Sequence, residues 1–109
     1  MATHHAEPGE LIDIPTWADE FEEEKTKSIA KLKEMQFVRL VLNAGQEFKE
    51  HKVAGPISVY CVDGEFELTA EGVTQVIKEK QMLYLAPGVT HSLQGIRDSV
   101  ILLTIAFVD

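Results

Sequence analysis

Apolar and polar residues alternate along most of the second half of the chain. Over residues 65–70, Phe66 and Leu68 fall on one side of an extended chain, and the glutamates and Thr69 fall on the other. This period of two predicts a half-buried β-strand. The segments that read as strands are 36–43, 57–62, 65–70, 73–78, 82–85, 90–96 and 99–108. Short strands at close spacing, with almost no helix, predict a β-sandwich or barrel.

Glycine-containing pairs separate several of these segments. Asp63-Gly64 predicts a two-residue hairpin turn, because both central positions of such a turn need positive φ. Glu71-Gly72 predicts a second tight turn, and Pro87-Gly88 predicts a third. The chain should therefore reverse direction at these three places.

The N-terminal part differs from the rest of the chain. Residues 17–24 are predicted to form a short helix, with Trp17 and Phe21 four positions apart on its buried face. The five acids in this segment are interpreted as a solvated helix face rather than a cation site. Residues 11–14 could add a short edge strand, and the first ten residues are expected to be loosely held.

Length and charge limit what the chain can do. Its 109 residues predict one domain over residues 1–109. The net charge of −8 argues against nucleic acid as a partner, and no apolar run reaches the ~20 residues that a membrane helix needs. We find no secretory signal pattern, and Cys61 is the only cysteine. These features predict a cytoplasmic domain without internal disulfides.

Two histidines stand at predicted strand junctions, where they could carry chemistry. His51 closes the segment that begins at Gly45, and His91 closes Pro87-Gly88-Val89-Thr90-His91. An imidazole can bind a transition metal, act as a general base, or hydrogen-bond to a ligand. If both rings point into one barrel, they share one site.

The spacing around these histidines resembles the two motifs of the cupin superfamily. Gly45-x5-His51, followed by Gly64, is similar to Gly-x5-His-x-His-x3,4-Glu-x6-Gly, and Gly88-x2-His91 is similar to the core of Gly-x5-Pro-x-Gly-x2-His-x3-Asn. The resemblance covers about residues 36–107. It implies an all-β, RmlC-like jelly-roll barrel, preceded by an N-terminal arm over about residues 1–30 that carries the short helix. Many cupins form dimers, so it also implies a homodimer.

The departures from the motifs bear on a metal site. Cupins commonly hold a metal with three histidines and one glutamate, but Val53 stands where the second histidine falls and Ile57 where the glutamate falls. Only His51 and His91 remain. Two imidazoles are too few ligands for zinc or non-haem iron, so a bound divalent transition metal would need further ligands.

The chain offers a few candidates for those further ligands. Gln46, Glu47 and Glu50 precede His51 in a segment interpreted as a loop. Strand alternation counted from Ile57 turns Cys61 toward the interior, where it could bind a metal. A buried cysteine is more often a small apolar core residue, and this interpretation of Cys61 is preferred.

The same replacements suggest what the barrel holds. Val53 and Ile57 make the interior more apolar, which suits the binding of a small molecule by apolar walls and a few polar groups. The predicted pocket residues are His51, His91, Val53, Ile57 and Cys61. The resemblance leaves two alternatives open. One is a metal-dependent cupin enzyme of the dioxygenase or isomerase type that uses His51 and His91, and the other is a metal-free epimerase or isomerase with a histidine base.

Overall fold

Antiparallel β-strands make up almost all the regular structure of the chain. The structure is a computed structural model, and it describes residues 6–16, 27–51 and 54–107. Within these residues the elements are η1 (Ile14–Thr16), β1 (Lys27–Lys31), β2 (Met35–Leu42), β3 (Glu47–His51), β4 (Ile57–Asp63), β5 (Glu65–Ala70), β6 (Val73–Lys78), β7 (Met82–Leu85), β8 (His91–Gly95) and β9 (Ser99–Ala106). The helix predicted over 17–24 lies outside the described residues. No helix in the described segments is long and apolar enough to cross a membrane.

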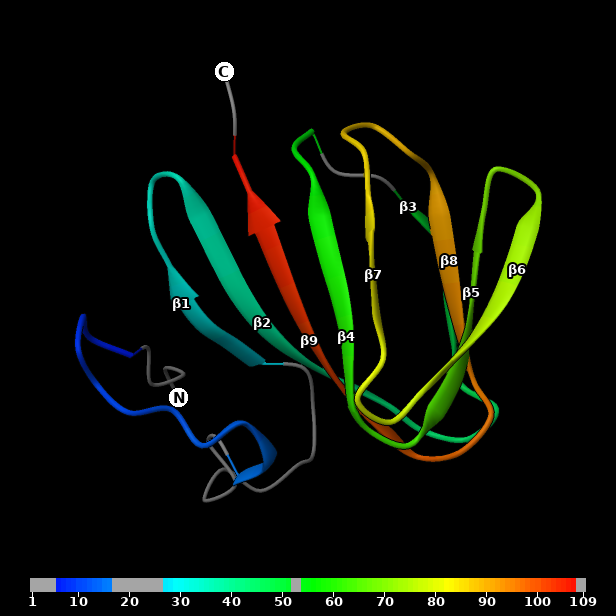
Figure 1. Cartoon of the computed structure of the whole chain (residues 1–109), viewed down its shortest axis with the longest axis horizontal. Coiled ribbons are helices and arrows are strands. Elements are labelled where there is room, and N and C mark those ends of the chain that lie inside the picture. Colours follow the sequence, from blue (N-terminus) through cyan, green and yellow to red (C-terminus); the bar gives the residue numbers. More distant parts are fainter. Residues whose placement is uncertain (1–5, 17–26, 52–53, 108–109) are drawn as a thin grey trace.

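The strands form two sheets that face each other (Figure 1). One sheet has five strands in the order β1-β2-β9-β4-β7, and the other has four in the order β3-β8-β5-β6. Along the described chain, only the β1–β2 and β5–β6 connections stay within a sheet, and the others pass from one sheet to the other. This arrangement confirms the predicted all-β jelly roll.

The core fills the space between the two sheets. Along β4 the residues alternate between buried and half-exposed, and Ile57, Val59 and Cys61 face inward as the sequence predicted. Along β5 the inward residues are Phe66 and Leu68. The buried core cluster consists of Leu40, Leu42, Val59, Cys61, Phe66, Leu68, Ile77, Leu93 and Ile101. Burying a large apolar side chain of this kind contributes about 1.5–3 kcal/mol, so the cluster is the main source of stability.

The glycine pairs give one confirmed hairpin and one correction. Glu71 and Gly72 have φ values of 52° and 78°, and they join β5 to β6 in a tight hairpin. The hairpin predicted at Asp63-Gly64 is wrong, because β4 and β5 belong to different sheets. Only Gly64 of that pair has positive φ, at 100°. The chain therefore turns a corner there and crosses to the facing sheet.

Ser99 holds this corner together. Its side chain is buried, with 2% of its surface exposed. The hydroxyl oxygen accepts the backbone N–H of Glu65 at 3.0 Å, and it lies 3.1 Å from the Glu65 carbonyl and 2.8 Å from the Arg97 carbonyl. One hydroxyl thus ties the first residue of β5 to the first residue of β9, which links the two sheets.

Two strands were missed and one predicted strand is absent. β1 and β3 are edge strands rich in charged residues, a composition that hides the strand pattern but suits an exposed edge. β3 covers residues that the sequence suggested were a loop. Residues 11–14 form no strand, and Ile14–Thr16 is instead a turn of 3-10 helix. Pro15 fits this short helical turn, because the first turn of a helix needs no N–H from its residues.

The N-terminal segment covers part of the outer face of the five-stranded sheet. Ile29 and Ala30 form a second buried cluster there, and the residues packed against it are Ala6, Ile12, Ile14, Phe37 and Leu102. Arg39 lies beneath the segment with only 3% of its surface exposed, and its Nη2 donates to the Pro15 carbonyl at 2.8 Å. The segment is therefore fastened to β2 by both apolar packing and a buried guanidinium.

Candidate functional site

The two candidate histidines meet at one end of the four-stranded sheet. β3 ends at His51 and β8 begins at His91, and the antiparallel register pairs these two residues directly. The register shifts between Phe48 and His51, so the end of β3 is irregular. We call this end of the sandwich, uppermost in Figure 1, the histidine end. The side chain of His51 lies outside the described part of the structure, and its backbone lies within it.

His91 is a buried polar residue on the interior face. Only 3% of its surface is exposed, and it alternates with buried Leu93 and pairs with Ala70 on β5. Its Nδ1 lies 3.1 Å from the Val89 carbonyl oxygen. Because a carbonyl only accepts, the neutral ring carries its proton on Nδ1 and its lone pair on Nε2. In this tautomer the acceptor nitrogen of the ring is Nε2.

The facing sheet brings apolar residues to the same end. β4 begins at the top of the sandwich in Figure 1. Its first residue, Ile57, has 3% of its surface exposed. It pairs with Leu85 on one side and with Ile105 on the other, so this row of the five-stranded sheet is apolar. The sequence expectation that Ile57 makes this part of the interior apolar agrees with this row. Val53, the other replacement, lies outside the described residues.

Cys61 lies at the opposite end of β4 from Ile57. Its side chain is fully buried, and its Sγ lies 3.5 Å from the carbonyl oxygen of Gly64 at the sheet corner. Four residues of strand separate it from Ile57, a span of about 13 Å at ~3.3 Å per residue. The structure therefore does not bring Cys61 and His91 together.

Gln46 and Glu47 also lie away from His91. The Gln46 side-chain oxygen accepts the backbone N–H of Asn43 at 2.9 Å, in the turn before β3. Glu47 is exposed and begins β3, and it pairs with Gln94 near the far end of β8. Glu47 is thus about 13 Å of strand away from His51.

The donor set in the described residues does not fit a resident metal. No group of three or more His, Cys, Asp or Glu residues converges there to hold an ion. Zinc and non-haem iron need at least three protein ligands. Ile57 fills the place of the cupin glutamate, and the side chains of Glu50 and His51 lie outside the described part of the structure.

The environment of Cys61 keeps its thiol neutral. Burial, and then the negative charges of Asp63 and Glu79, raise the pKa of the Cys61 thiol above its ordinary value of 9.0. Only a thiolate acts as a nucleophile or a metal ligand. The interpretation of Cys61 as a small apolar core residue agrees with its complete burial.

The raised pKa of Cys61 predicts a loss of stability in alkali. The thiol binds its proton more tightly in the folded chain, so its contribution is complete below pH 9.0 and is lost as pH rises through the higher folded pKa. We expect the free energy of unfolding to fall by up to about 1.4 kcal/mol per pH unit between pH 9.0 and the folded pKa. Urea denaturation at several pH values measures this slope. Cys61→Ala should show a shallower slope, and equal slopes would contradict the prediction.

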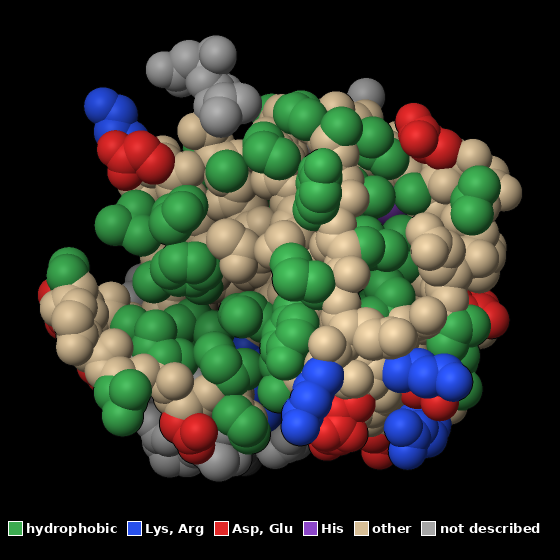
Figure 2. Space-filling view, viewed as in Figure 1, with side chains coloured by type: hydrophobic (Ala, Val, Ile, Leu, Met, Phe, Trp, Pro, Cys, Tyr) green, Lys and Arg blue, Asp and Glu red, His purple; other side chains and the backbone are tan. Residues whose placement is uncertain are grey.

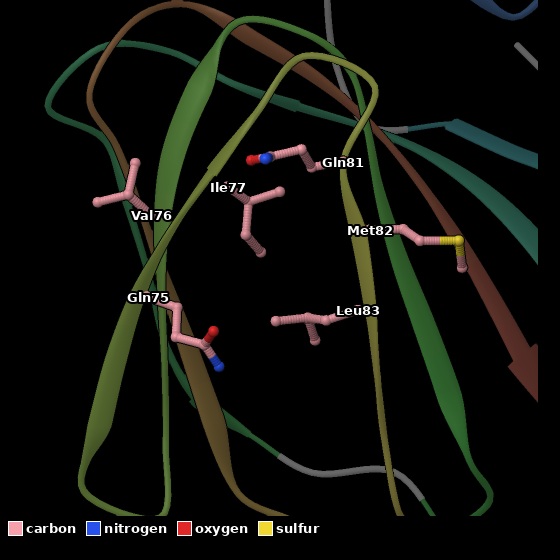
Figure 3. A pocket seen from close by; sticks show the side chains of 6 residues that line it. All are labelled: Gln75, Val76, Ile77, Gln81, Met82 and Leu83. Carbon is pink, nitrogen blue, oxygen red and sulfur yellow. The ribbon is translucent and has the colours of Figure 1, made fainter.

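A hollow of about 370 Å³ opens along the seam between β6 and β7 (Figure 3). It is lined by Gln75, Val76, Ile77, Gln81, Met82 and Leu83. Ile77 and Leu83 point toward one another across the seam, whereas Met82 points away from it (Figure 3). None of these residues was among the predicted pocket residues, because the hollow lies where the edge strands β6 and β7 of the two sheets meet and no sequence motif indicates this contact.

Comparison with known proteins supports the fold and leaves the chemistry open. No family model matches the sequence, and no curated protein matches it. A conserved protein of unknown function from Streptococcus pyogenes superposes with a TM-score of 0.80 at 19% identity, over 100% of this chain and 96% of that one.

Two further solved structures are named as cupins. A cupin superfamily protein from Desulfitobacterium hafniense has a TM-score of 0.75 at 15% identity, over 84% of this chain and 87% of its own. An RmlC-like cupin from Shewanella frigidimarina has a TM-score of 0.70 at 21% identity, over 74% and 73%. These similarities extend over most of each chain and concern its fold. The chain therefore has the cupin fold.

Proposed function

We propose that the interior at the histidine end binds a small molecule that has an apolar body and one hydrogen-bond donor. The observation that carries this proposal is His91, a buried imidazole on an apolar interior face whose Nδ1 lies against the Val89 carbonyl. Ligand sites of this kind combine apolar walls with a few placed polar groups. The chain is thus proposed to be a small-molecule-binding cupin.

The tautomer of His91 defines the chemistry of the ligand. With the proton on Nδ1, Nε2 accepts a hydrogen bond, so a hydroxyl or an N–H on the ligand is its natural partner. Ile57, Leu85 and Ile105 supply the apolar wall on the facing sheet. The backbone of His51 pairs with that of His91 at the same end of the sheet.

Phenol and anisole test this proposal, because anisole carries a methyl group in place of the hydroxyl hydrogen of phenol and therefore has no hydrogen bond to donate. We expect phenol to shift the ¹H–¹⁵N signals of His91, Ala70 and Ile57, and to bind about tenfold more tightly than anisole, the worth of one hydrogen bond. In His91→Asn the side-chain amide can still donate to the Val89 carbonyl, but the acceptor at the Nε2 position is lost. This variant should bind phenol and anisole equally.

Ser92→Ala is the matched control, because Ser92 follows His91 on β8 and belongs to the opposite face of the sheet. It should keep the preference for phenol. A preference for phenol that persists in His91→Asn would overturn the proposal, as would shifts confined to signals away from the histidine end. Thermal unfolding of each variant shows that the binding change is not caused by loss of the fold.

Elemental analysis of untagged protein separates this proposal from the metalloenzyme alternative. A small-molecule binder of this kind should contain less than one equivalent of transition metal per chain. A full equivalent of metal that disappears in His51→Ala would instead favour a metal site built on His51 and His91.

A further inference from the structure

In the described part of the chain each sheet has two edge strands, and three of these four edges are protected. β1 pairs with β2 through a register shift between Ser28 and Ala30, and its Ile29 carbonyl accepts the Ala6 N–H at 2.8 Å. The register of β3 against β8 is also shifted, and β7 has only four residues. Bulges, short strands and covering segments are the usual ways in which proteins keep an edge from pairing with another chain.

β6 is the fourth edge strand, and its register is regular. Its six residues, Val73–Lys78, pair with β5 without a shift. The five residues before Lys78 are uncharged and include no proline. Within residues 6–16, 27–51 and 54–107, β6 is hydrogen-bonded to no strand but β5. An edge of this length and composition can accept a further strand.

The turn that follows β6 identifies the backbone groups on its outer edge. The Lys78 N–H donates to the Gln81 side-chain oxygen at 2.9 Å, and the Lys78 carbonyl accepts the Gln81 N–H at 3.0 Å. The backbone groups of Lys78 therefore point away from β5. This direction alternates along an antiparallel ladder, so the N–H and carbonyl groups of Val76 and Thr74 also point away from β5. The Thr69 and Thr74 hydroxyls, 2.8 Å apart, agree with this assignment, because side chains come closest in pairs without backbone hydrogen bonds.

The hollow of about 370 Å³ lies against this edge of β6. β6 forms one of its sides and β7 the other, and Ile77 and Leu83 point toward one another across it (Figure 3). Figure 2 shows the same face of the molecule in space-filling form, with hydrophobic side chains reaching the surface in this region. A strand added to β6 would turn alternate side chains toward this apolar pair. Because β7 bounds the hollow on its other side, the space suits a single extended segment better than the edge of a second two-sheet domain.

We infer that the outer edge of β6 binds an extended peptide segment of a partner protein, which adds a strand to the four-stranded sheet. An extended chain supplies N–H and carbonyl groups at the two-residue spacing of Thr74 and Val76. Ile77 and Leu83 favour a segment with apolar residues at alternate positions. The net charge of −8 favours a positively charged segment and disfavours a second copy of this chain. The inference goes beyond the proposed function, since the hollow is lined by other residues than those proposed to bind the small molecule.

Amide hydrogen exchange with a synthetic peptide tests the inference on the unmodified chain. The probe is the hexapeptide lysine-threonine-valine-threonine-valine-lysine, acetylated and amidated at its ends. Without the probe, the amides of Thr74 and Val76 should exchange quickly, whereas those of Gln75 and Ile77, which bond to β5, should be protected. The saturating probe should slow the exchange of Thr74 and Val76 at least about tenfold and leave the amides of β3 unchanged.

Two results of this experiment would overturn the inference. One is protection of Thr74 and Val76 without the probe, because the chain itself or a second copy of it would then already cover this edge. The other is exchange at Thr74 and Val76 that the probe does not slow.

The same hexapeptide with every backbone nitrogen methylated is the control for docking by side chains alone. It keeps the side chains of the probe but cannot donate hydrogen bonds to the Thr74 and Val76 carbonyls. We expect it to bind roughly thirtyfold more weakly, the worth of two hydrogen bonds. Equal binding of the two peptides would show that no strand is added to β6 and would overturn the inference.

Val76→Pro and Tyr84→Pro identify the edge that the probe uses. Val76→Pro removes one edge donor without breaking a bond to β5, and proline is tolerated in edge strands. Tyr84→Pro makes the same change on the outer edge of β7. The Cys61 N–H bonds to the Gln81 carbonyl at 2.9 Å, and alternation from this pair turns the Tyr84 N–H away from β4.

We expect Val76→Pro to weaken binding of the probe at least about tenfold and Tyr84→Pro to leave it unchanged. The reverse result would place the peptide on β7 and overturn the choice of edge. The ¹H–¹⁵N spectrum of each variant shows whether its fold is intact, and the exchange experiment on the unmodified chain does not depend on either variant. The phenol test at the histidine end does not depend on these results.

Discussion

Gly64→Ala is expected to lower the free energy of unfolding by about 3–5 kcal/mol. Gly64 has φ of 100°, a backbone conformation that costs an alanine ~1–2 kcal/mol. An added Cβ would also lie against the Asp98 carbonyl oxygen and 2.6 Å from the Cα of Ser99. These are backbone atoms of the sheet corner, so they cannot rotate away, and the corner itself must shift.

Gly88→Ala separates the two causes of this loss. Gly88 also has positive φ, at 79°, but a Cβ there would meet nothing within 4 Å. We expect Gly88→Ala to cost only the ~1–2 kcal/mol of the backbone conformation. Urea denaturation of both variants measures the difference, which reports the close approach between the two sheets. Equal losses in the two variants would show that the corner has room for a methyl group.

Phe66→Ala is expected to lower the free energy of unfolding by about 3–5 kcal/mol. Phe66 has 0% of its surface exposed and is the largest fully buried side chain among the described residues. It follows the Gly64 corner and pairs with Ile77 and Gly95 on its neighbouring strands. A domain of this size is stable by only ~5–15 kcal/mol, so the variant should lie near its unfolding threshold at 37 °C.

Val76→Ala is the matched control for the core substitution. Val76 lies on β6 beside Phe66's partner Ile77, but it is 45% exposed. We expect this variant to lose no more than about 0.5 kcal/mol, the usual range for surface substitutions. Calorimetry gives the melting temperature of each variant. If Phe66→Ala and Val76→Ala have the same melting temperature, the core has repacked to fill the space of the ring and the prediction is wrong.

The strand pattern was readable because packing and alternation agree at particular residues. Phe66 and Leu68 alternate with Glu65 and Glu67 along β5. The two apolar residues are buried, and the two glutamates lie at the surface. The tight turn at Glu71-Gly72 was predicted from the composition of the pair, and both residues have positive φ. A structural feature that depends on a few neighbouring residues can therefore be predicted from the sequence.

The features that were wrongly predicted or missed depend on contacts between residues far apart in the sequence. Asp63-Gly64 has the composition of a hairpin, but β4 finds its partners in β7 and β9, far along the chain. The burial of Arg39 beneath the N-terminal segment, where its Nη2 donates to the Pro15 carbonyl, was not predicted. Neither outcome depends on local propensity, so no short stretch of sequence could report it.

The candidate site was predictable in part. The motif spacing pointed to His51 and His91, and the register of β3 and β8 pairs their backbones. The same reasoning could not place Cys61 along the barrel, because alternation fixes the face of a residue and not which end of the strand lies near a given histidine. The bond from His91 to the Val89 carbonyl was also hidden, since it depends on the path of the chain into β8.

The position of β9 has a consequence for how the chain is made. β9 is the last strand of the described chain, yet it lies in the middle of the five-stranded sheet, hydrogen-bonded to β2 on one side and β4 on the other. A ribosome delivers β2 and β4 well before the strand that joins them. Until Ser99–Ala106 has left the exit tunnel, both earlier strands have an open edge that another chain could occupy. The five-stranded sheet is therefore complete only after β9 has been inserted, and until then the nascent chain is exposed to aggregation.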